Sequence, residues 1–205
     1  MAQNPSDPER VAREQKATAD RLGAFSDAVI AVIITIMVLE LKPPQEATFS
    51  ALLPLWPTAI SYSVSYVFIA IIWLNHHHLL RFVGHTTPAL IWVNFAHLFC
   101  ISLIPFATTW VARTELASAP VAAYAAIFVC VNIAYRVFER QVLYQADVTQ
   151  IPQSTRSVVR GRSLATLVIF VAAMLVALVA PRIGFALICC ALLLYLRPEA
   201  PSLKL

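Results

Sequence analysis

Three consecutive histidines, His76, His77 and His78, are the most conspicuous chemistry-bearing residues of the sequence. They follow a long apolar run, so we expect them at the end of a membrane-spanning helix. Histidine is a common metal ligand, but successive side chains on a helix point about 100° apart, so three adjacent ones do not converge on one ion. The cluster therefore predicts a membrane-boundary site in which one histidine pairs with a buried partner.

Asp27 is the natural partner for that histidine. It lies at the head of the first apolar run, at the same predicted membrane depth as the end of the second run. Ionisable residues inside spans are costly and mark functional or structural sites. We predict that Asp27 pairs with His76 or His77, and the pattern leaves open which of the two.

A stripe of apolar side chains runs along one face of the first predicted helix. At helical spacing, Val32, Thr35, Ile36 and Leu39 fall within an arc of about 100°, and Asp27 points elsewhere. One interpretation is ordinary helix packing or lipid contact. The other is a pore lining, because each position becomes a ring in a symmetric oligomer, and rings of Val, Ile and Leu form a constriction that gates by excluding water.

Glu40 directly follows this stripe. A ring of carboxylates at the mouth of a pore concentrates cations. A solvated helix end is the alternative interpretation. Further along, a third apolar run contains Asn94, His97 and Ser102, which we expect to hydrogen-bond between helices, and Pro105, which we expect to kink its helix.

The elements that must position these residues are predicted transmembrane helices. Of the 205 residues, 60% are hydrophobic and 13% are charged, with a mean hydropathy of +0.74. Soluble domains are about 45–50% apolar and roughly 25% charged. Continuous apolar runs favour helices over the alternating strands of a barrel. The expected spans are 22–41, 51–73 extending into the histidines, 88–111, 117–137, 164–180 and 183–196.

Basic residues predict the orientation and the domain organisation. With a cytoplasmic amino terminus, twelve of the fifteen Lys and Arg residues lie on the cytoplasmic side, as the positive-inside rule requires. Both termini are therefore expected in the cytoplasm. The expected organisation is a cytoplasmic tail at 1–20, a six-helix channel domain at 21–197 with a polar cytoplasmic loop at about 140–162, and a second tail at 198–205.

Other function classes have little support in the sequence. The four glycines form no phosphate-binding pattern, and we find no nucleophile–base pair or metal set typical of an enzyme. Basic residues that follow the positive-inside pattern make a nucleic-acid partner unnecessary. The four cysteines lie within apolar spans and are expected to be small core residues rather than disulfides: Cys100, Cys130, Cys189 and Cys190.

The first helix resembles a known signature. Arg21 followed by Phe25-Ser26-Asp27 is similar to the motif of the transmembrane protein 175 potassium channels, in their bacterial branch with six helices per chain. The apolar continuation to Glu40, the histidines that end helix two and the Pro-Phe…Thr segment of helix three also look like this family. The resemblance covers the whole chain in length and helix count, and its specific part is the first helix.

The resemblance implies a homotetramer in which the first helix lines a central pore. The family's bulky constriction residues correspond to Val32, Ile36 and Leu39, and its pore threonine to Thr35. Larger residues than Val are common at the first of these positions, so the narrowest point is expected at Ile36 or Leu39. The residues expected to hold the pore helices together are Arg21, Phe25, Ser26, Asp27 and either His76 or His77.

The expected function is passive conduction of potassium, weakly selective over sodium, in the bacterial inner membrane. Potassium holds its water less tightly, so it crosses an apolar constriction at lower cost, and Thr35 hydroxyls or backbone dipoles replace part of that water. Potassium ions, lipid and copies of the same chain are the expected partners, and no cofactor is expected. The alternative is a proton-coupled secondary transporter that uses Asp27 and the histidines, although no helices are clearly broken mid-membrane in paired positions.

Overall fold

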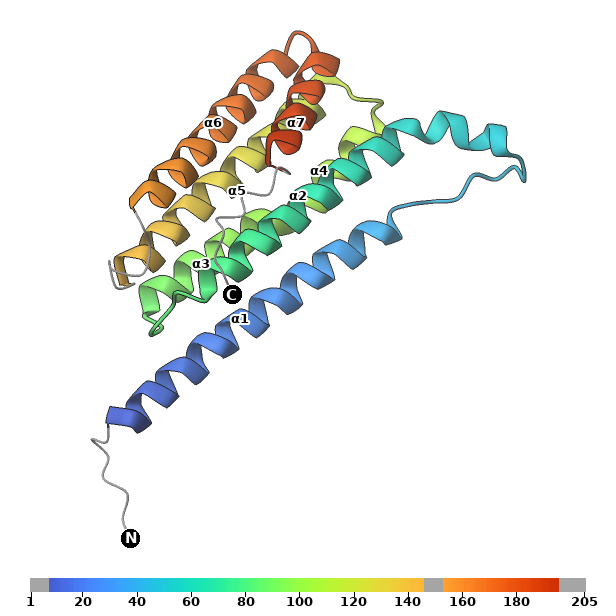
Figure 1. Cartoon of the computed structure of the whole chain (residues 1–205). Coiled ribbons are helices and arrows are strands. Elements are labelled where there is room, and N and C mark those ends of the chain that lie inside the picture. The colour runs from blue at the N-terminus through green and yellow to red at the C-terminus, as the bar shows by residue number, and fades with distance from the viewer. Residues whose placement is uncertain (1–7, 146–152, 196–205) are drawn as a thin grey trace.

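The computed structural model describes residues 8–145 and 153–195, and the regular elements within them are all helical. Figure 1 shows them as a bundle of long helices. In chain order they are α1 (Pro8–Leu39), the 3-10 helix η1 (Phe49–Leu55), α2 (Trp56–Leu80), α3 (Pro88–Ser102), α4 (Ile104–Arg113), α5 (Ser118–Gln145), α6 (Gln153–Ala177) and α7 (Pro181–Tyr195).

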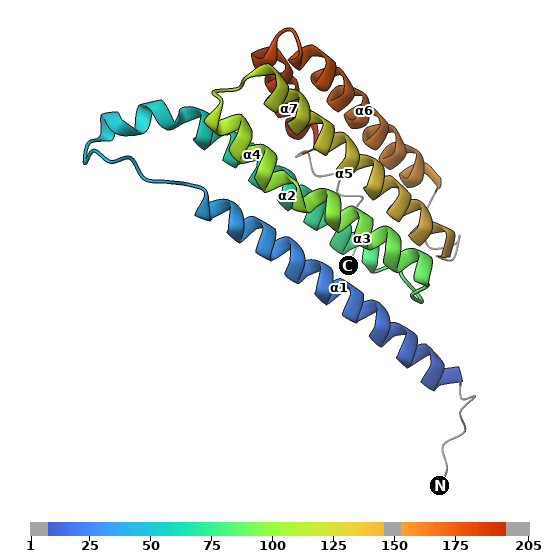
Figure 2. The same ribbon diagram turned by 180° about the vertical axis from the view of Figure 1, so that it is seen from behind.

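These helices make six passes, so the predicted all-α membrane fold is confirmed. Four helical segments are long and apolar enough to cross a bilayer: Arg13–Leu39, Phe49–Leu80, Pro88–Arg113 and Ser118–Tyr144. The last two passes are the shorter apolar helices Ser163–Ala177 and Pro181–Leu193. Successive passes run in opposite directions, which Figures 1 and 2 show from two sides.

The bundle places α1 at one edge and α6 at the other. Helix α1 packs mainly on α2 and α3, whereas α5, α6 and α7 pack closely together. Between these edges lies an aromatic core in which the Phe68 and Phe128 rings stack at 3.7 Å between centroids. Phe170 meets the Phe128 ring edge-on at 5.4 Å. Since α1 has neighbours on one side only, the structure leaves its outer face uncovered.

A buried chain of hydroxyl groups ties three helices together. The Thr108 hydroxyl donates to the Ile104 carbonyl at 2.7 Å, so it accepts from Ser65 at 2.6 Å, and Ser65 in turn accepts from the Tyr124 hydroxyl at 2.6 Å. Lipid offers no alternative partner for a polar group. This chain therefore fixes the relative positions of α2, α4 and α5.

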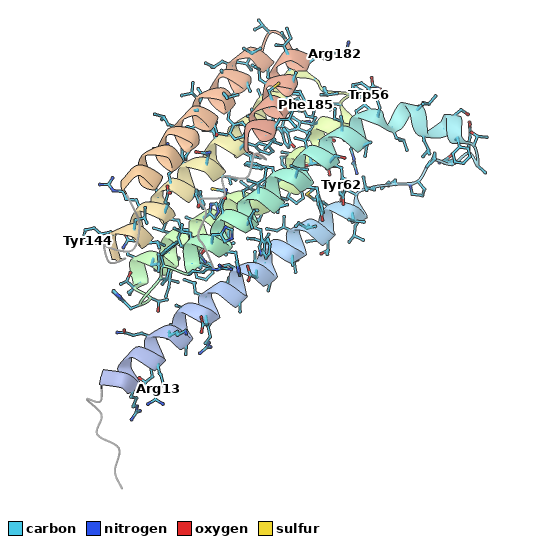
Figure 3. The ribbon with its side chains drawn as sticks, viewed as in Figure 1. Arg13, Trp56, Tyr62, Tyr144, Arg182 and Phe185 are labelled. Atoms are coloured by element: carbon cyan, nitrogen blue, oxygen red, sulfur yellow. The ribbon has the colours of Figure 1, made fainter. Side chains whose placement is uncertain are left out.

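Helices α6 and α7 form the predicted tight hairpin. The turn between them is closed by the Ala180 N–H, which donates to the Val176 carbonyl at 2.8 Å. Figure 3 shows Arg182 beside this turn, and Phe185 pointing from α7 into the bundle. A Cβ atom at Gly184 would lie 2.8 Å from the Ala173 oxygen and 2.8 Å from the Ala177 Cβ. Only glycine allows this close approach of the two helices.

The first helix begins earlier than expected. The predicted tail at 1–20 is helical from Pro8 onward, and residues 1–7 lie outside the described part. Proline suits the first turn of a helix, and the following Ala, Glu, Gln, Lys and Arg residues favour helix. Arg10 also pairs with Glu14 one turn later at 2.9 Å. Ala19 and Leu22 then bury against the far ends of α2, α3 and α5.

Other predicted boundaries need correction for similar reasons. The polar loop expected at about 140–162 is largely helical, because α5 continues to Gln145 and α6 begins at Gln153. A polar surface does not end a helix that carries good helix formers. Residues 146–152 and the predicted tail at 198–205 lie outside the described residues. Two of the four cysteines are core residues as expected, because Cys100 and Cys189 are half-buried and pack against the hydrophobic core. Cys130 and Cys190 are exposed, so the expectation is wrong for them.

The predicted kink at Pro105 is present as an interruption of the third span. Helix α3 ends at Ser102, Leu103 forms a turn and α4 starts at Ile104. Proline has no N–H to continue the helical ladder, and it is tolerated in the first turn of the next helix. The Ser102 hydroxyl donates to the Phe99 carbonyl at 2.7 Å. The third span therefore divides into two helical segments, α3 and α4.

Candidate pore helix and the network behind it

The stripe singled out in the sequence occupies the uncovered face of α1. The side chains of Val32, Ile36 and Leu39 are 54%, 47% and 78% exposed in the single chain. On the opposite face, Ile33 and Met37 are buried against the rest of the bundle. The helix is thus apolar on both faces, with one face packed inside the subunit and the other available to lipid, to another copy or to a pore.

Thr35 is the polar member of this face. Its hydroxyl donates to the Val32 carbonyl of its own helix at 2.8 Å, and the side chain is exposed. A hydroxyl that donates in this way keeps its oxygen lone pairs directed away from the helix. The arrangement places the Thr35 oxygen among exposed apolar side chains of the same face.

Behind α1, a buried hydrogen-bond chain joins three helices. The Ser26 hydroxyl donates to the Leu22 carbonyl at 2.9 Å and accepts from Asn94 Nδ2 at 2.9 Å. Asn94 Oδ1 therefore accepts from His76 Nε2–H, at 2.7 Å. The side chains of Ser26, Asn94 and His76 are all fully buried. This chain fixes α1 to α3 and α2 in a region where unpaired polar groups are costly.

Three aromatic contacts support the same region. The His76 ring stacks on His97 at 5.9 Å and on Phe138 at 5.0 Å, which brings α5 into the assembly. Nearer the uncovered face, Phe25 meets Phe95 of α3 edge-on at 5.4 Å. Phe25 therefore packs α1 against α3, while Ser26 makes the buried hydrogen bonds.

Asp27 faces α2, as the predicted pairing requires, and the structure distinguishes the two histidines. Its Oδ1 accepts from Trp73 Nε1 at 2.8 Å, and its Oδ2 lies 3.9 Å from His77 Nδ1. The Trp73 and His77 rings stack at 5.4 Å, so both present their nitrogens to one carboxylate. His76 belongs to the buried chain instead, and His78 is exposed. The three rings thus diverge as helical geometry predicts.

Arg21 lies apart from this network within a single chain. Its side chain is exposed, and it makes no hydrogen bond or ion pair with the residues that the structure describes. At helical spacing it continues the stripe of Val32 and Leu39 toward the amino terminus. Its predicted role in holding pore helices together therefore finds no partner within the described part of a single chain.

Glu40 lies where the stripe ends, and the structure gives it a partner that the sequence did not indicate. Arg113 Nη2, at the end of α4, is 3.4 Å from Glu40 Oε2. The sequence also did not indicate the hydrogen bond from Trp73 to Asp27, because a tryptophan near the end of a span is typical of the membrane interface. For the buried hydrogen-bond chain, Asn94 was the signal that the sequence offered. An amide inside an apolar run needs a hydrogen-bond partner, and Asn94 has the same predicted membrane depth as Ser26.

Comparisons with known proteins agree with this geometry. Residues 21–105 match the model of the family described as the endosomal/lysosomal potassium channel TMEM175. A potassium channel of Chryseobacterium sp. (strain P1-3) is 41% identical over 126 residues, which cover 62% of this chain and 66% of that protein. A potassium channel of Chamaesiphon minutus is 35% identical over 133 residues, covering 60% and 65% respectively. The matched segment thus spans just under two thirds of these relatives.

The likeness extends to more distant proteins and to a solved structure. The human endosomal/lysosomal proton channel TMEM175 is 28% identical over 93 residues, which cover 43% of this chain and 18% of that protein. The crystal structure of a lysosomal potassium-selective channel TMEM175 homologue from Chamaesiphon minutus superposes with a TM-score of 0.77 at 25% identity. The match covers 90% of this chain and 100% of that chain. The sequence comparisons and the superposed structure therefore indicate the same family.

Proposed function

Because the chain belongs to the TMEM175 family of ion channels, we propose that it assembles as a homotetramer that conducts potassium passively. In this proposal α1 of each copy lines the central pore. The observation that carries it is the uncovered face of α1, where Val32, Ile36 and Leu39 are exposed although a subunit core covers the opposite face. The relatives named as potassium channels support the choice of ion.

Selectivity in this proposal comes from the cost of removing water. Rings of Ile36 and Leu39 form a constriction that a fully hydrated cation does not pass, and potassium loses water more readily than sodium. The Thr35 oxygens, held outward by the bond to the Val32 carbonyl, replace part of the lost hydration. A preference produced in this way is modest, because no rigid cage of carbonyls matches one ionic radius.

Ser26, Asn94 and His76 have a supporting role in this function. They hold α1 against α2 and α3 without facing the uncovered side of the helix. Asp27, Trp73 and His77 brace the same helix nearer its surface. A constriction only a few ångströms wide requires pore helices that keep their positions, and these bonds hold α1 in position.

Ion flux into proteoliposomes that contain only the purified protein tests the proposal. A potassium gradient alone should drive uptake that does not saturate and that exceeds sodium uptake under a matched gradient. Empty liposomes and heat-inactivated protein are the controls. Flux that saturates and needs a proton gradient would instead establish a proton-coupled carrier using Asp27 and the histidines.

Proton permeability is measured in the same preparation with a pH-sensitive dye trapped inside. The distant human relative is named a proton channel. We expect potassium uptake to continue when the pH is equal on both sides, because passive conduction needs only the potassium gradient. Loss of potassium uptake at equal pH would overturn the proposed mechanism.

A further inference from the structure

The ion pair between Arg113 and Glu40 lies at the end of the proposed pore helix. Glu40 directly follows Leu39, which is the most exposed residue of the apolar stripe. Arg113 is the last residue of α4, and its Nη2 lies 3.4 Å from Glu40 Oε2. The two helices are adjacent here, so the charge of Glu40 is compensated within its own subunit.

The turn after α4 fixes the backbone that carries Arg113, whose side chain is 65% exposed. The Thr114 hydroxyl donates to the Trp110 carbonyl at 2.7 Å, and the Leu116 N–H donates to the Val111 carbonyl at 3.1 Å. Glu115 and Leu116 have φ values of 50° and 60°, which residues other than glycine adopt rarely. Leu116 keeps this conformation because its side chain is buried in the core, only 4% exposed.

A small hollow lies beneath the pair. It has a volume of about 50 Å³, is partly open to the outside and lies between α1, α2 and α4, with Glu40, Arg113, Ser61, Tyr62 and Thr109 among its lining residues. Figure 3 shows Tyr62 on α2 beside the end of α1. A space of this size with several polar groups accommodates water. The pair is therefore partly hydrated. A passing ion meets one negative and one positive charge side by side, and their electric fields largely cancel.

From this geometry we propose that Arg113 is a tethered counter-ion that cancels the charge of Glu40 at the pore mouth. The inference rests on the proposed function, since it needs α1 to line a pore. A ring of free Glu40 carboxylates would concentrate cations at the mouth. With Arg113 in place, the mouth is close to neutral at each Glu40, and the apolar constriction alone sets the conductance.

Other charges lie near the same end of the helix. Lys42, Glu46 and Glu115 are exposed on the adjoining loops, and Lys42, the basic residue among them, makes no ion pair with Glu40 in the described residues. Lys42 provides a matched control, because K42Q removes one positive charge per subunit near the mouth without removing the partner of Glu40. A general effect of net charge is thereby separated from the effect of the pair.

The experiment measures single-channel potassium conductance in planar bilayers for the wild type and for R113Q, E40Q, R113Q/E40Q and K42Q. Recordings are made in KCl at about 10 mM and at about 1 M, where the screening lengths are roughly 30 Å and 3 Å. At low salt we expect R113Q to raise the conductance and E40Q to lower it, each by about two- to fivefold, the effect of a unit charge at roughly 4–8 Å in water.

The double variant should return to within about a factor of two of the wild type at low salt, and all variants should converge at high salt. K42Q should change the low-salt conductance less than R113Q does. Equal effects of R113Q and K42Q, or no effect of R113Q on channels that still conduct, would overturn the inference and leave the proposed channel function intact. Absence of passive current from the wild type would instead refute the proposed function.

Discussion

The side-chain amide of Asn94 donates a hydrogen bond to the Ser26 hydroxyl at 2.9 Å, which joins α3 to the back of the proposed pore helix. Both residues are fully buried, and the other side of Asn94 accepts from His76. One amide thus connects three helices. Its position behind α1, rather than on the uncovered face, makes it a structural bond whose loss acts on the pore indirectly.

Replacing Asn94 with alanine should therefore destabilise the subunit. The change leaves the His76 N–H without an acceptor and the Ser26 oxygen without a donor, at a cost of about 1–3 kcal/mol for each buried unpaired group. We expect a lower melting temperature in a thermal-shift assay in detergent. Ser102→Ala is the control, because that exposed hydroxyl donates only to the Phe99 carbonyl of its own helix. Equal melting temperatures for the two variants would contradict the role of Asn94.

Asp27→Ala should weaken the proposed tetramer, because it removes the acceptor for Trp73 and the charge beside His77. Asp27→Asn retains an acceptor oxygen for Trp73 and should have a smaller effect. The partly exposed site limits the loss to about 1 kcal/mol per interaction. Size-exclusion chromatography after mild heating measures the remaining tetramer. A fully intact tetramer of Asp27→Ala would rule out a role for this carboxylate in tetramer stability.

Gly184→Ala should separate α6 from α7. A methyl group there meets the backbone oxygen of Ala173 and the Cβ of Ala177 at 2.8 Å, and overpacking of this kind costs about 1–3 kcal/mol. Gly84→Ala is the matched control, because a Cβ at Gly84 meets nothing within 4 Å. Limited proteolysis and thermal shift should detect the difference. A Gly184→Ala protein as stable as the control would show that the hairpin relaxes easily.

The sequence predicts the helices well because lipid imposes a strict demand. Each span must satisfy its own backbone groups, so a run of apolar residues such as the one ending at Leu39 has one regular structure open to it. The pattern of Val32, Ile36 and Leu39 on one face follows from helical geometry alone. What the pattern did not decide was whether that face packs inside the subunit, and the structure answers this by burying Ile33 instead.

Pairings between distant residues were harder to predict. Nothing in the sequence near Glu40 indicates Arg113, which lies 73 positions later at the end of α4. The pairing of Asp27 was predicted as a class, but two histidines were equivalent in the pattern. The two side chains point about 100° apart because they are consecutive residues on α2. His76 therefore reaches Asn94, and His77 reaches Asp27.

The central claim is that the stripe of Val32, Thr35, Ile36 and Leu39 on α1 lines the pore. The most direct test is the single-channel conductance of Ile36→Asn compared with that of Val38→Asn. Both residues are 47% exposed in the single chain, so the two variants add the same polar group to equally accessible positions. They differ in direction, because two residues along a helix place the Val38 side chain about 160° from that of Ile36.

A polar ring at Ile36 hydrates the constriction, so Ile36→Asn should raise the potassium conductance several-fold and reduce the preference for potassium over sodium. Val38→Asn should leave both quantities close to the wild type. Equal conductance in Ile36→Asn and the wild type, or an increase in Val38→Asn alone, would contradict the assignment of this face of α1 to the pore.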